Sequence, residues 1–306
     1  MGDEKYLKPN RATTASDVAK FLKTGLFGED LQLKTVTSLN DITANALIFS
    51  KGNLSTNFLK SIHRVCIITS ALPDIIGSNA FIIVDNPRLA FAKTLEKFFI
   101  EKKKPDIGEY TVIHPTAKIG KAVLIGNGCT IGRNVVIGDH TEIRNNVVIA
   151  DSVKIGRHCR IKSNTVIGEK GFGFDFETDG TPVELPHLKS VQIGDHVEIG
   201  ALNTVVGGAL KDTIIQSYVK TDDHVHVAHN CVIGAKTVIT ACTEISGSVI
   251  IGEQCWLGPN CSIMNKIKIG DNCFIGLGTV VLKDVPSGAV IAGNPAKVIR
   301  MQKSEL

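Results

Sequence analysis

The sequence predicts a mainly β protein in which a parallel β-helix follows a small α/β domain. Two observations predict this fold. An aliphatic residue recurs at every sixth position over more than half of the chain, whereas the first hundred residues lack that period and alternate short apolar runs with helical segments. Eleven isoleucines follow one another at the six-residue spacing from Ile107 to Ile167, commonly with glycine after them. Such a period is typical of a β-helix whose short strands turn after each hexad.

The first predicted unit is a small α/β domain over residues 1–104. Thr14 or Ser16 is suited to cap a helix that ends near Lys23. Further elements follow from apolar runs and their flanking residues. Strands are expected at residues 47–49, 65–68 and 81–84, and helices at about 57–63 and 87–99.

The second predicted unit is the β-helix over residues 105–285. Alternation along each strand points the repeated aliphatic side chain toward the axis. The period breaks after Ile167, resumes at Ile193, breaks again after Val205, and then runs from Val227 to Val281. The two breaks predict insertions near residues 169–190 and 206–210, because loops must leave a repeat without disturbing its strands. The longer loop is expected to be functional or, alternatively, to serve packing.

The cysteines follow the same period. Six of the eight lie two residues before a repeated aliphatic residue. This position favours a role as small core fillers and not as zinc ligands or disulfide partners. We therefore expect no metal and no disulfide from these cysteines.

Composition narrows the class of protein. The formal charge of +4 comes from 34 basic and 30 acidic residues, with no basic block interleaved with aromatic residues, which argues against nucleic acid as the main partner. The polar start is unlike a secretory signal, and no apolar stretch approaches the roughly 20 residues of a membrane helix. We expect a cytoplasmic protein.

Three motifs in this setting resemble one enzyme family. They are the Gly-Phe-Gly-Phe run at 171–174, the Gly-Ala-Leu-Lys-Asp-Thr-Ile-Ile run at 208–215, and the Ala-His-Asn run at 228–230. Together with the α/β domain they resemble the UDP-3-O-acylglucosamine N-acyltransferases of lipid A synthesis, over nearly the whole chain to about residue 285. The resemblance implies a left-handed β-helix with 18-residue coils, about nine coils here, and a homotrimer.

The same resemblance implies three catalytic residues. His229 matches the family's general base, and Asp222, seven residues earlier, matches its carboxylate partner. A neutral imidazole suits the removal of a proton from an amine that attacks a thioester. Gly247 lies 18 residues after His229, so one coil should separate them, and the family uses the backbone N–H at this position as the oxyanion donor.

The resemblance also implies substrate contacts, but only some of these positions match the family. Phe49 falls near the family's uracil-stacking aromatic, and the remaining candidates are Phe172, Phe174, His187, His226 and Lys266. Lys266 replaces a second family histidine, residues 51–54 replace the family's nucleotide-contacting run, and Val206-Gly207 replaces an Asp-Arg pair. These departures weaken the inference that the substrate is that of the lipid A enzyme.

The third predicted unit is the C-terminal segment over residues 286–306. The lipid A enzymes continue into helices that engage acyl carrier protein, whereas this segment resembles the ending of CoA-dependent sugar acetyltransferases. The resemblance implies that it lines the acyl-donor groove. The expected CoA contacts are Lys283, Asn294, Pro295, Lys297 and Arg300.

The sequence therefore favours an N-acyltransferase of the EC 2.3.1 class. We expect it to move a short acyl group, acetyl or a small hydroxyacyl, from acyl-CoA to the amine of a dTDP- or UDP-linked amino sugar for surface polysaccharide such as O-antigen, without cofactor or metal. The first alternative is the lipid A enzyme itself, with a hydroxyacyl carrier protein as donor. The second is a non-catalytic scaffold or a carbonic-anhydrase-like zinc trimer that uses His224, His226 and His229.

Overall fold

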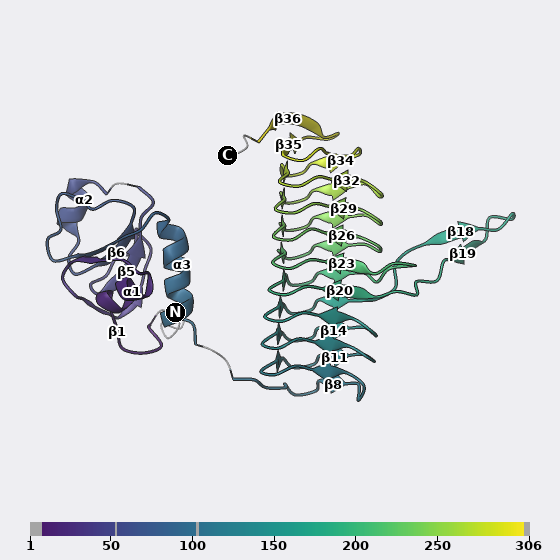
Figure 1. Ribbon diagram of the computed structural model, residues 1–306, viewed down its shortest axis with the longest axis horizontal. Coiled ribbons are helices and arrows are strands. Elements are labelled where there is room, and N and C mark those ends of the chain that lie inside the picture. The colour runs from purple at the N-terminus through teal and green to yellow at the C-terminus, as the bar shows by residue number, and fades with distance from the viewer. Residues whose placement is uncertain (1–7, 53, 102–103, 303–306) are drawn as a thin grey trace. The chain divides into compact units, whose positions relative to one another are not determined.

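The computed structural model describes residues 8–52, 54–101 and 104–302 and forms two compact units, Met1–Lys103 and Lys104–Leu306 (Figure 1). The fold is mainly β, and the larger unit is a parallel β-helix of short strands, as the six-residue period predicts. Residues 102 and 103, next to the expected boundary at 104, lie outside the described residues.

The first unit is an α/β domain around a five-stranded sheet with the order β2-β7-β6-β5-β4. Its strands β4 to β7 are parallel, and β2 pairs with β7 in the antiparallel sense. The sheet strands are β2 (Leu26–Gly28), β4 (Thr35–Val36), β5 (Ala46–Phe49), β6 (Cys66–Thr69) and β7 (Ala80–Ile83). The remaining elements are the strand pair β1 (Thr13–Thr14) and β3 (Gln32–Leu33), and helices α1 (Ala15–Phe21), α2 (Thr56–Ser61) and α3 (Pro87–Phe98).

Local chemistry explains where these elements begin. Helix α1 starts after Thr14 because the Thr14 side chain and the Asp17 carboxylate cap each other's backbone N–H groups. Helix α3 starts with Pro87, whose fixed φ suits the first helical position. The expected strands and helices are all present within a few residues. The short strands β1 to β4 were not predicted, because two or three residues carry no periodic signal.

The second unit is a three-sided prism, and each side is one sheet whose strands are parallel apart from the last strand of the first face. The first face contains β10 (Leu124–Ile125), β13 (Glu142–Ile143), β16 (Arg160–Ile161), β21 (Glu198–Ile199), β24 (Lys220–Thr221), β27 (Val238–Ile239), β30 (Trp256–Leu257), β33 (Phe274–Ile275), β35 (Ala289–Ala292) and the antiparallel β36 (Lys297–Met301). The second contains β8 (Val112–Ile113), β11 (Thr130–Ile131), β14 (Val148–Ile149), β17 (Val166–Ile167), β22 (Thr204–Val205), β25 (His226–Val227), β28 (Glu244–Ile245), β31 (Ser262–Ile263) and β34 (Val280–Val281). The third contains β9 (Lys118–Ile119), β12 (Val136–Ile137), β15 (Lys154–Ile155), β20 (Val191–Ile193), β23 (Thr213–Ile215), β26 (Val232–Ile233), β29 (Ile250–Ile251) and β32 (Lys268–Ile269).

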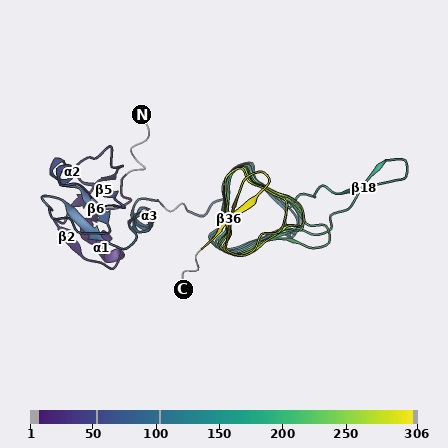
Figure 2. The same ribbon diagram turned by 90° about the horizontal axis from the view of Figure 1, so that it is seen from above.

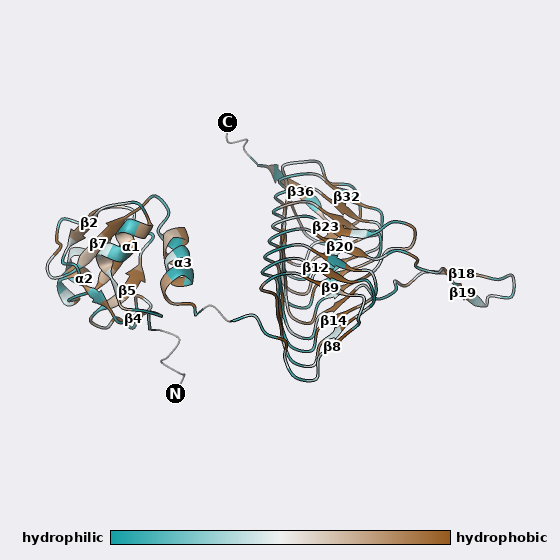
Figure 3. Ribbon diagram, turned by 60° about the horizontal axis from the view of Figure 1, so that its bottom comes forward, coloured by the Kyte–Doolittle hydropathy of each residue, from teal (hydrophilic) through white to brown (hydrophobic). Residues whose placement is uncertain are grey.

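Residues 18 apart stack on successive coils of the prism. Ile125 pairs with Ile143 on the first face, and Ile131 pairs with Ile149 on the second. The repeated aliphatic side chains fill the interior, and hydrophobic residues gather along the prism strands in Figure 3. The six periodic cysteines are buried and free, whereas Cys242 is exposed.

The prism turns at three corners, which we name by the faces they join: 1–2, 2–3 and 3–1. Turns at all three corners use residues in the left-handed region, for example Asn134 with φ 53° and His140 with φ 59°. Asn and His tolerate this region better than β-branched residues do. The corners therefore carry polar side chains while the strands carry the core.

Both insertions leave the prism at the 2–3 corner. Ile167 of β17 pairs with Val205 of β22, so this coil holds 38 residues, and the next coil holds 22 because Ile193 pairs with Ile215. The longer insertion carries the hairpin β18 (Phe174–Phe176) and β19 (Pro182–Glu184), which projects from the outline that the stacked coils share (Figure 2). The strands above and below keep their register.

The C-terminal segment closes the first face. Strand β35 pairs with β33 and so continues the sheet, and β36 folds back along β35. Residues 303–306 of the predicted donor segment lie outside the described residues. Within the described ranges, no helix has the length and apolar character needed to cross a bilayer.

Candidate active site

The 2–3 corner carries the predicted general base and the predicted oxyanion donor. The 18-residue spacing places His229, Gly247 and Lys283 in one column along this corner. Backbone hydrogen bonds fix the column, since Ser248 N donates to His229 O at 2.8 Å and Lys266 N donates to Gly247 O at 3.0 Å. Both insertions leave from the same corner on the coils just below His229.

Gly247 lies directly against the imidazole of His229. A Cβ atom at position 247 would stand 2.6 Å from both Cε1 and Nε2 of the ring, well inside ordinary contact. Only glycine leaves the ring where it is. The structure thus brings His229 and Gly247 together on adjacent coils, as the spacing predicts.

The backbone N–H of Gly247 is available to a ligand. At regular corners the corresponding N–H donates to a side chain one coil above, as Arg133 N does to Asp151 and Glu253 N to Asp271, both at 2.7 Å. Among the described residues, no acceptor takes the N–H of Gly247. A free donor beside a proton acceptor is the arrangement that stabilises an oxyanion in acyl transfer.

The base of the long insertion packs against His229. The ring centres of His187 and His229 are 5.1 Å apart, with the ring planes at 73° to each other. Gly171 packs against the His187 ring, since a Cβ at position 171 would stand 2.5 Å from His187 Nε2. His187 is buried. Its Nδ1 lies 2.9 Å from the carbonyl oxygen of Leu185, while its Nε2 has no partner among the described residues.

Burial of the ring, together with the neighbouring His187, holds the pKa of His229 below its ordinary value. A lowered pKa keeps the ring neutral and able to accept a proton near neutral pH. His187 therefore acts on His229, in addition to its predicted substrate contact, which no observation tests. No periodic signal in the sequence reveals this packing, because His187 lies in an insertion.

The short insertion sets the tautomer of His229. Ala209 N donates to Oδ1 of Asn230 at 2.8 Å, which turns the Asn230 amide nitrogen toward Nδ1 of His229 at 3.1 Å. In this arrangement Nδ1 accepts a hydrogen bond and the proton of the neutral ring lies on Nε2. Proton uptake at Nε2 requires the other tautomer, which an acceptor at Nδ1 stabilises.

Asp222 does not supply that acceptor within one chain. It follows β24 at the 1–2 corner, whereas His229 follows β25 at the 2–3 corner, so a full strand of the second face separates them. The Asp222 side chain is exposed. The two residues do not meet within one chain, because seven residues carry the backbone past one corner to the next, and the role of Asp222 as carboxylate partner stays a prediction.

The other predicted substrate residues are spread over the prism. Phe172 is 86% exposed and stacks near Phe174 at the base of the projecting hairpin, with ring centres 4.8 Å apart. His226 lies on the second face between Thr204 and Glu244. Lys266 is exposed at the 2–3 corner, two coils above His229.

The predicted donor contacts do not form one cluster. Lys283 belongs to the column of His229, three coils above it, but Lys297 and Arg300 lie on β36 at the end of the first face. Asn294 and Pro295 lie in the turn between β35 and β36. The segment folds into a hairpin after the hexads end, and its predicted place along the acyl-donor groove stays a prediction.

A separate pocket lies in the N-terminal domain. It has a volume of about 520 Å³ and contains Phe49, Lys51 and Arg88, with Thr37, Ser38 and Leu39 at its wall. Phe49 is held by Phe91, whose ring centre is 4.9 Å away. An aromatic face beside two cations suits a planar base linked to phosphates. Sequence reasoning missed Arg88, which no motif marks.

The described residues of one chain contain no group of three or more His, Cys, Asp or Glu side chains placed to hold a metal ion. The zinc alternative calls on His224, His226 and His229. These lie at the 1–2 corner, on the second face and at the 2–3 corner, so one chain does not bring them together.

Comparisons with known proteins agree with the hexapeptide repeat. The family described as bacterial transferase hexapeptide (six repeats) matches residues 248–283, and the GMPPB C-terminal domain matches residues 107–171. The UDP-3-O-acylglucosamine N-acyltransferase of Herminiimonas arsenicoxydans is 33% identical over 306 residues, covering 90% of this chain and 85% of the relative. That of Campylobacter lari is 34% identical over 305 residues, covering 95% and 94%. The solved structure of LpxA from Acinetobacter baumannii aligns with a TM-score of 0.59 at 28% identity, over 64% of this chain and 74% of that chain.

These relatives overturn the main functional expectation. The chain was expected to move a short acyl group from CoA to a nucleotide-linked amino sugar for surface polysaccharide. Relatives that match along almost their whole length carry the name UDP-3-O-acylglucosamine N-acyltransferase, which is the first alternative. The short-acyl, CoA-dependent interpretation is therefore wrong.

Proposed function

The chain belongs to the UDP-3-O-acylglucosamine N-acyltransferase family and is an acyltransferase, and from this premise we propose that it acylates the amine of a UDP-3-O-acylglucosamine. The observation that carries the proposal is the contact between His229 and Gly247, with a free N–H on Gly247. One group removes a proton and the other stabilises negative charge, which are the two needs of amide formation from a thioester.

The proposed reaction is a direct attack. The amine lone pair attacks the thioester carbonyl while His229 takes the proton that the amine loses. The carbonyl oxygen gains negative charge, and the N–H of Gly247 donates to it. When the carbonyl reforms, the carbon–sulfur bond breaks and the thiol leaves. Holding amine and thioester together supplies much of the acceleration, about 7 to 11 kcal/mol in favourable cases.

We propose that Asp222 reaches His229 from a neighbouring copy in a homotrimer. Asp222 and His229 stand at opposite edges of the second face. If three copies turn this face toward a common threefold axis, the 2–3 corner of each copy meets the 1–2 corner of the next. The carboxylate then replaces the Asn230 amide at Nδ1 of His229 and accepts its N–H, which frees Nε2 to take the proton.

The pocket of the N-terminal domain is proposed to hold the uridine diphosphate group. Phe49 offers an aromatic face for the uracil ring, and Lys51 and Arg88 offer charge to the phosphates. These residues replace the family run that is absent at positions 51–54. The pocket therefore supports nucleotide binding by a different set of side chains.

The acyl donor is proposed to be a hydroxyacyl carrier protein, as the family resemblance implies. Lys283 stands three coils above His229 in the same column, or about 14 Å at the usual strand spacing of about 4.8 Å. A pantetheine arm that runs along this corner brings its thioester to His229 and its phosphate toward Lys283.

The proposal is tested with purified protein, UDP-3-O-acylglucosamine and 3-hydroxyacyl carrier protein. We expect a product heavier by one acyl group and stoichiometric release of carrier thiol, both lost in His229→Ala. Absence of product with every carrier-bound chain length would overturn the proposal. Product formed only from acyl-CoA would refute the assignment of the donor.

Mixing inactive variants tests the shared site. His229→Ala and Asp222→Ala are each expected to be nearly inactive alone. Trimers reassembled from equal amounts contain some interfaces with both residues intact, which restores up to roughly a quarter of wild-type turnover. No recovery after verified subunit exchange would show that Asp222 and His229 do not meet between copies.

A further inference from the structure

At one level of the prism a polar side chain takes the inward position that otherwise holds the repeated aliphatic residue. In every other parallel prism strand of the described residues the repeated inward position holds Ile, Val or Leu, but in β24 it holds Thr221. One coil below, Asn203 takes the small-residue position before β22. Both are nearly fully buried, at 5% and 2% exposure. The six-residue rule therefore fails next to the corner that carries Asp222.

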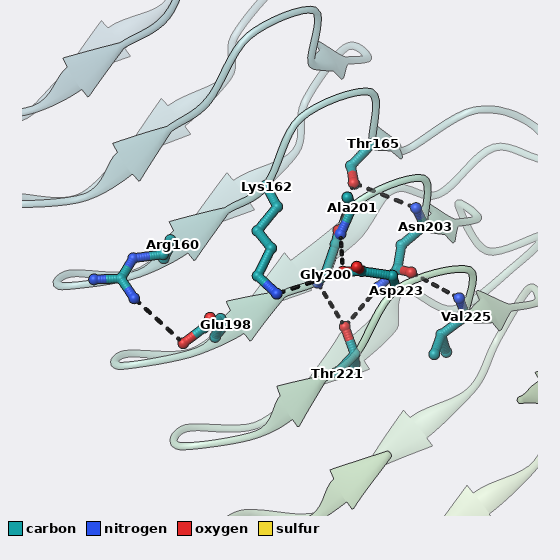
Figure 4. Close-up of polar contacts among 10 residues, drawn as sticks. All are labelled: Arg160, Lys162, Thr165, Glu198, Gly200, Ala201, Asn203, Thr221, Asp223 and Val225. Carbon is teal, nitrogen blue, oxygen red and sulfur yellow. Dashed lines mark hydrogen bonds and ion pairs between the residues drawn. The ribbon is translucent and has the colours of Figure 1, made fainter. Parts of the chain in front are cut away.

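The buried polar groups form a closed hydrogen-bond network (Figure 4). Asn203 donates through Nδ2 to Thr221 Oγ1 at 2.6 Å and accepts through Oδ1 from Val225 N at 2.7 Å. Gly200 N donates to the same Thr221 oxygen at 3.0 Å. Thr165 Oγ1 donates to Gly200 O at 2.7 Å. Each buried side-chain nitrogen or oxygen atom of the network has at least one hydrogen-bond partner, so the network fixes geometry with no wholly unpaired atom.

A second set of contacts holds the same corner from outside. Asp223 accepts from Ala201 N at 2.7 Å and pairs with Lys162 Nζ at 3.4 Å. The Ala201 N–H and the nearby Lys162 hold the pKa of Asp223 below its ordinary value, although partial burial acts in the opposite direction. Asp223 thus remains ionised and anchored.

Asp222 lies between these two anchors. The Thr221 side chain is hydrogen-bonded inside the prism, and the Asp223 carboxylate is hydrogen-bonded outside it. A Cβ on Gly200 would collide with the carbonyl oxygen of Asp222, so the backbone of this corner packs directly on the coil below. The Asp222 carboxylate is exposed and makes no hydrogen bond within the described residues. The backbone of Asp222 is held on both sides while its carboxylate stays free for another partner.

We infer that Asn203 and Thr221 are positioning residues that aim the Asp222 carboxylate. The inference rests on the proposed function, in which this carboxylate orients His229 of a neighbouring copy. Stability alone does not require the network, because well-packed apolar side chains of similar size are often as stabilising as buried polar groups. Directional hydrogen bonds instead restrict the corner to one geometry, and small displacements of a catalytic partner reduce turnover strongly.

The test restores the apolar rule with Asn203→Val combined with Thr221→Ile. We expect an unchanged or higher Tm, an unchanged oligomer, a kcat at least tenfold lower, and KM values within twofold of wild type. Thr221→Ser, which keeps the hydroxyl, should retain kcat within twofold. Thr237→Val is the matched control, since Thr237 is a buried prism threonine with hydrogen bonds of 2.8 Å to Gly252 O and 3.1 Å from Cys255 N.

Two readouts separate positioning from a structural role. In an Asp222→Ala background the double substitution should lower the residual kcat less than twofold, because its effect passes through Asp222. An equal loss in both backgrounds, or wild-type kcat in the double variant, would overturn the inference. If the double variant does not fold, Thr221→Val carries the same comparison with the same two outcomes.

Amide hydrogen exchange keeps this test separate from that of the proposed function. Residues 222–225 should exchange at least tenfold faster in the double variant while neighbouring coils stay protected. Unchanged exchange there would refute the positioning role whatever substrate the enzyme uses. Wild-type protein that fails to acylate UDP-3-O-acylglucosamine would instead refute the proposed function.

Discussion

Gly247→Ala tests the geometry on which the proposed chemistry depends. The added Cβ would stand 2.6 Å from Cε1 and Nε2 of His229, whereas ordinary contacts begin at 3.4 Å, so the ring must move by about 0.8 Å. A misplacement approaching 1 Å can cost about 100-fold in rate. That loss corresponds to about 2.7 kcal/mol in the activation free energy. The N–H of residue 247 is retained, so the substitution acts mainly through the position of the ring.

The assay is steady-state acylation with both substrates varied. We expect kcat to fall by 10- to 100-fold and the KM for the UDP-sugar to change little, because the Phe49 pocket belongs to the other unit. Gly25→Ala is the control, since the nearest atom to its added Cβ is 3.9 Å away. A folded Gly247→Ala enzyme with wild-type kcat would show that the working enzyme does not hold His229 against this glycine.

Three further predictions address the base, its titration and the nucleotide pocket. His229→Ala should lower kcat by about 100-fold or more, the usual scale for a lost general base, with Tm unchanged; near-normal kcat would remove His229 from the mechanism. In Asp222→Ala, burial and His187 lower the pKa of His229 with no carboxylate to oppose them. In the pH profile of the residual kcat/KM, the apparent pKa of the acid limb should then fall below both the wild-type value and the ordinary histidine value of about 6.5. An unchanged apparent pKa would contradict the carboxylate contact. Phe49→Ala should weaken UDP binding by about tenfold, measured by calorimetry, and unchanged affinity would place the nucleotide elsewhere.

The six-residue period predicts most of the larger unit. One aliphatic residue per hexad determines the strand, its inward face and its neighbour 18 residues away, so the stacking of Gly247 on His229 follows from the sequence. The same counting locates both insertions, because a coil that gains residues only at a corner leaves all its strands paired. Local rules suffice wherever the repeat continues.

The sequence does not predict contacts that depend on an insertion, on a second copy or on the chain beyond the repeat. His187 lies in an insertion, so no register relates it to His229. Asp222 matches the family by spacing, but hexad geometry sends it to another corner. The C-terminal run that suggested CoA forms a hairpin that closes the first face, a structural role that does not specify a donor.

The prism and its interruptions contribute different parts of the candidate site. The regular coils supply the close contact of Gly247 with the ring and the free N–H beside it. The environment of the ring comes from the insertions: the long one brings His187 against His229, and the short one brings Ala209 to orient Asn230. A β-helix tolerates additions at its corners because each coil contacts only its neighbours. A uniform repeat would thus present the oxyanion donor without His187, which lowers the pKa of His229, and without the Asn230 contact, which an acceptor at Nδ1 must replace before Nε2 can take a proton.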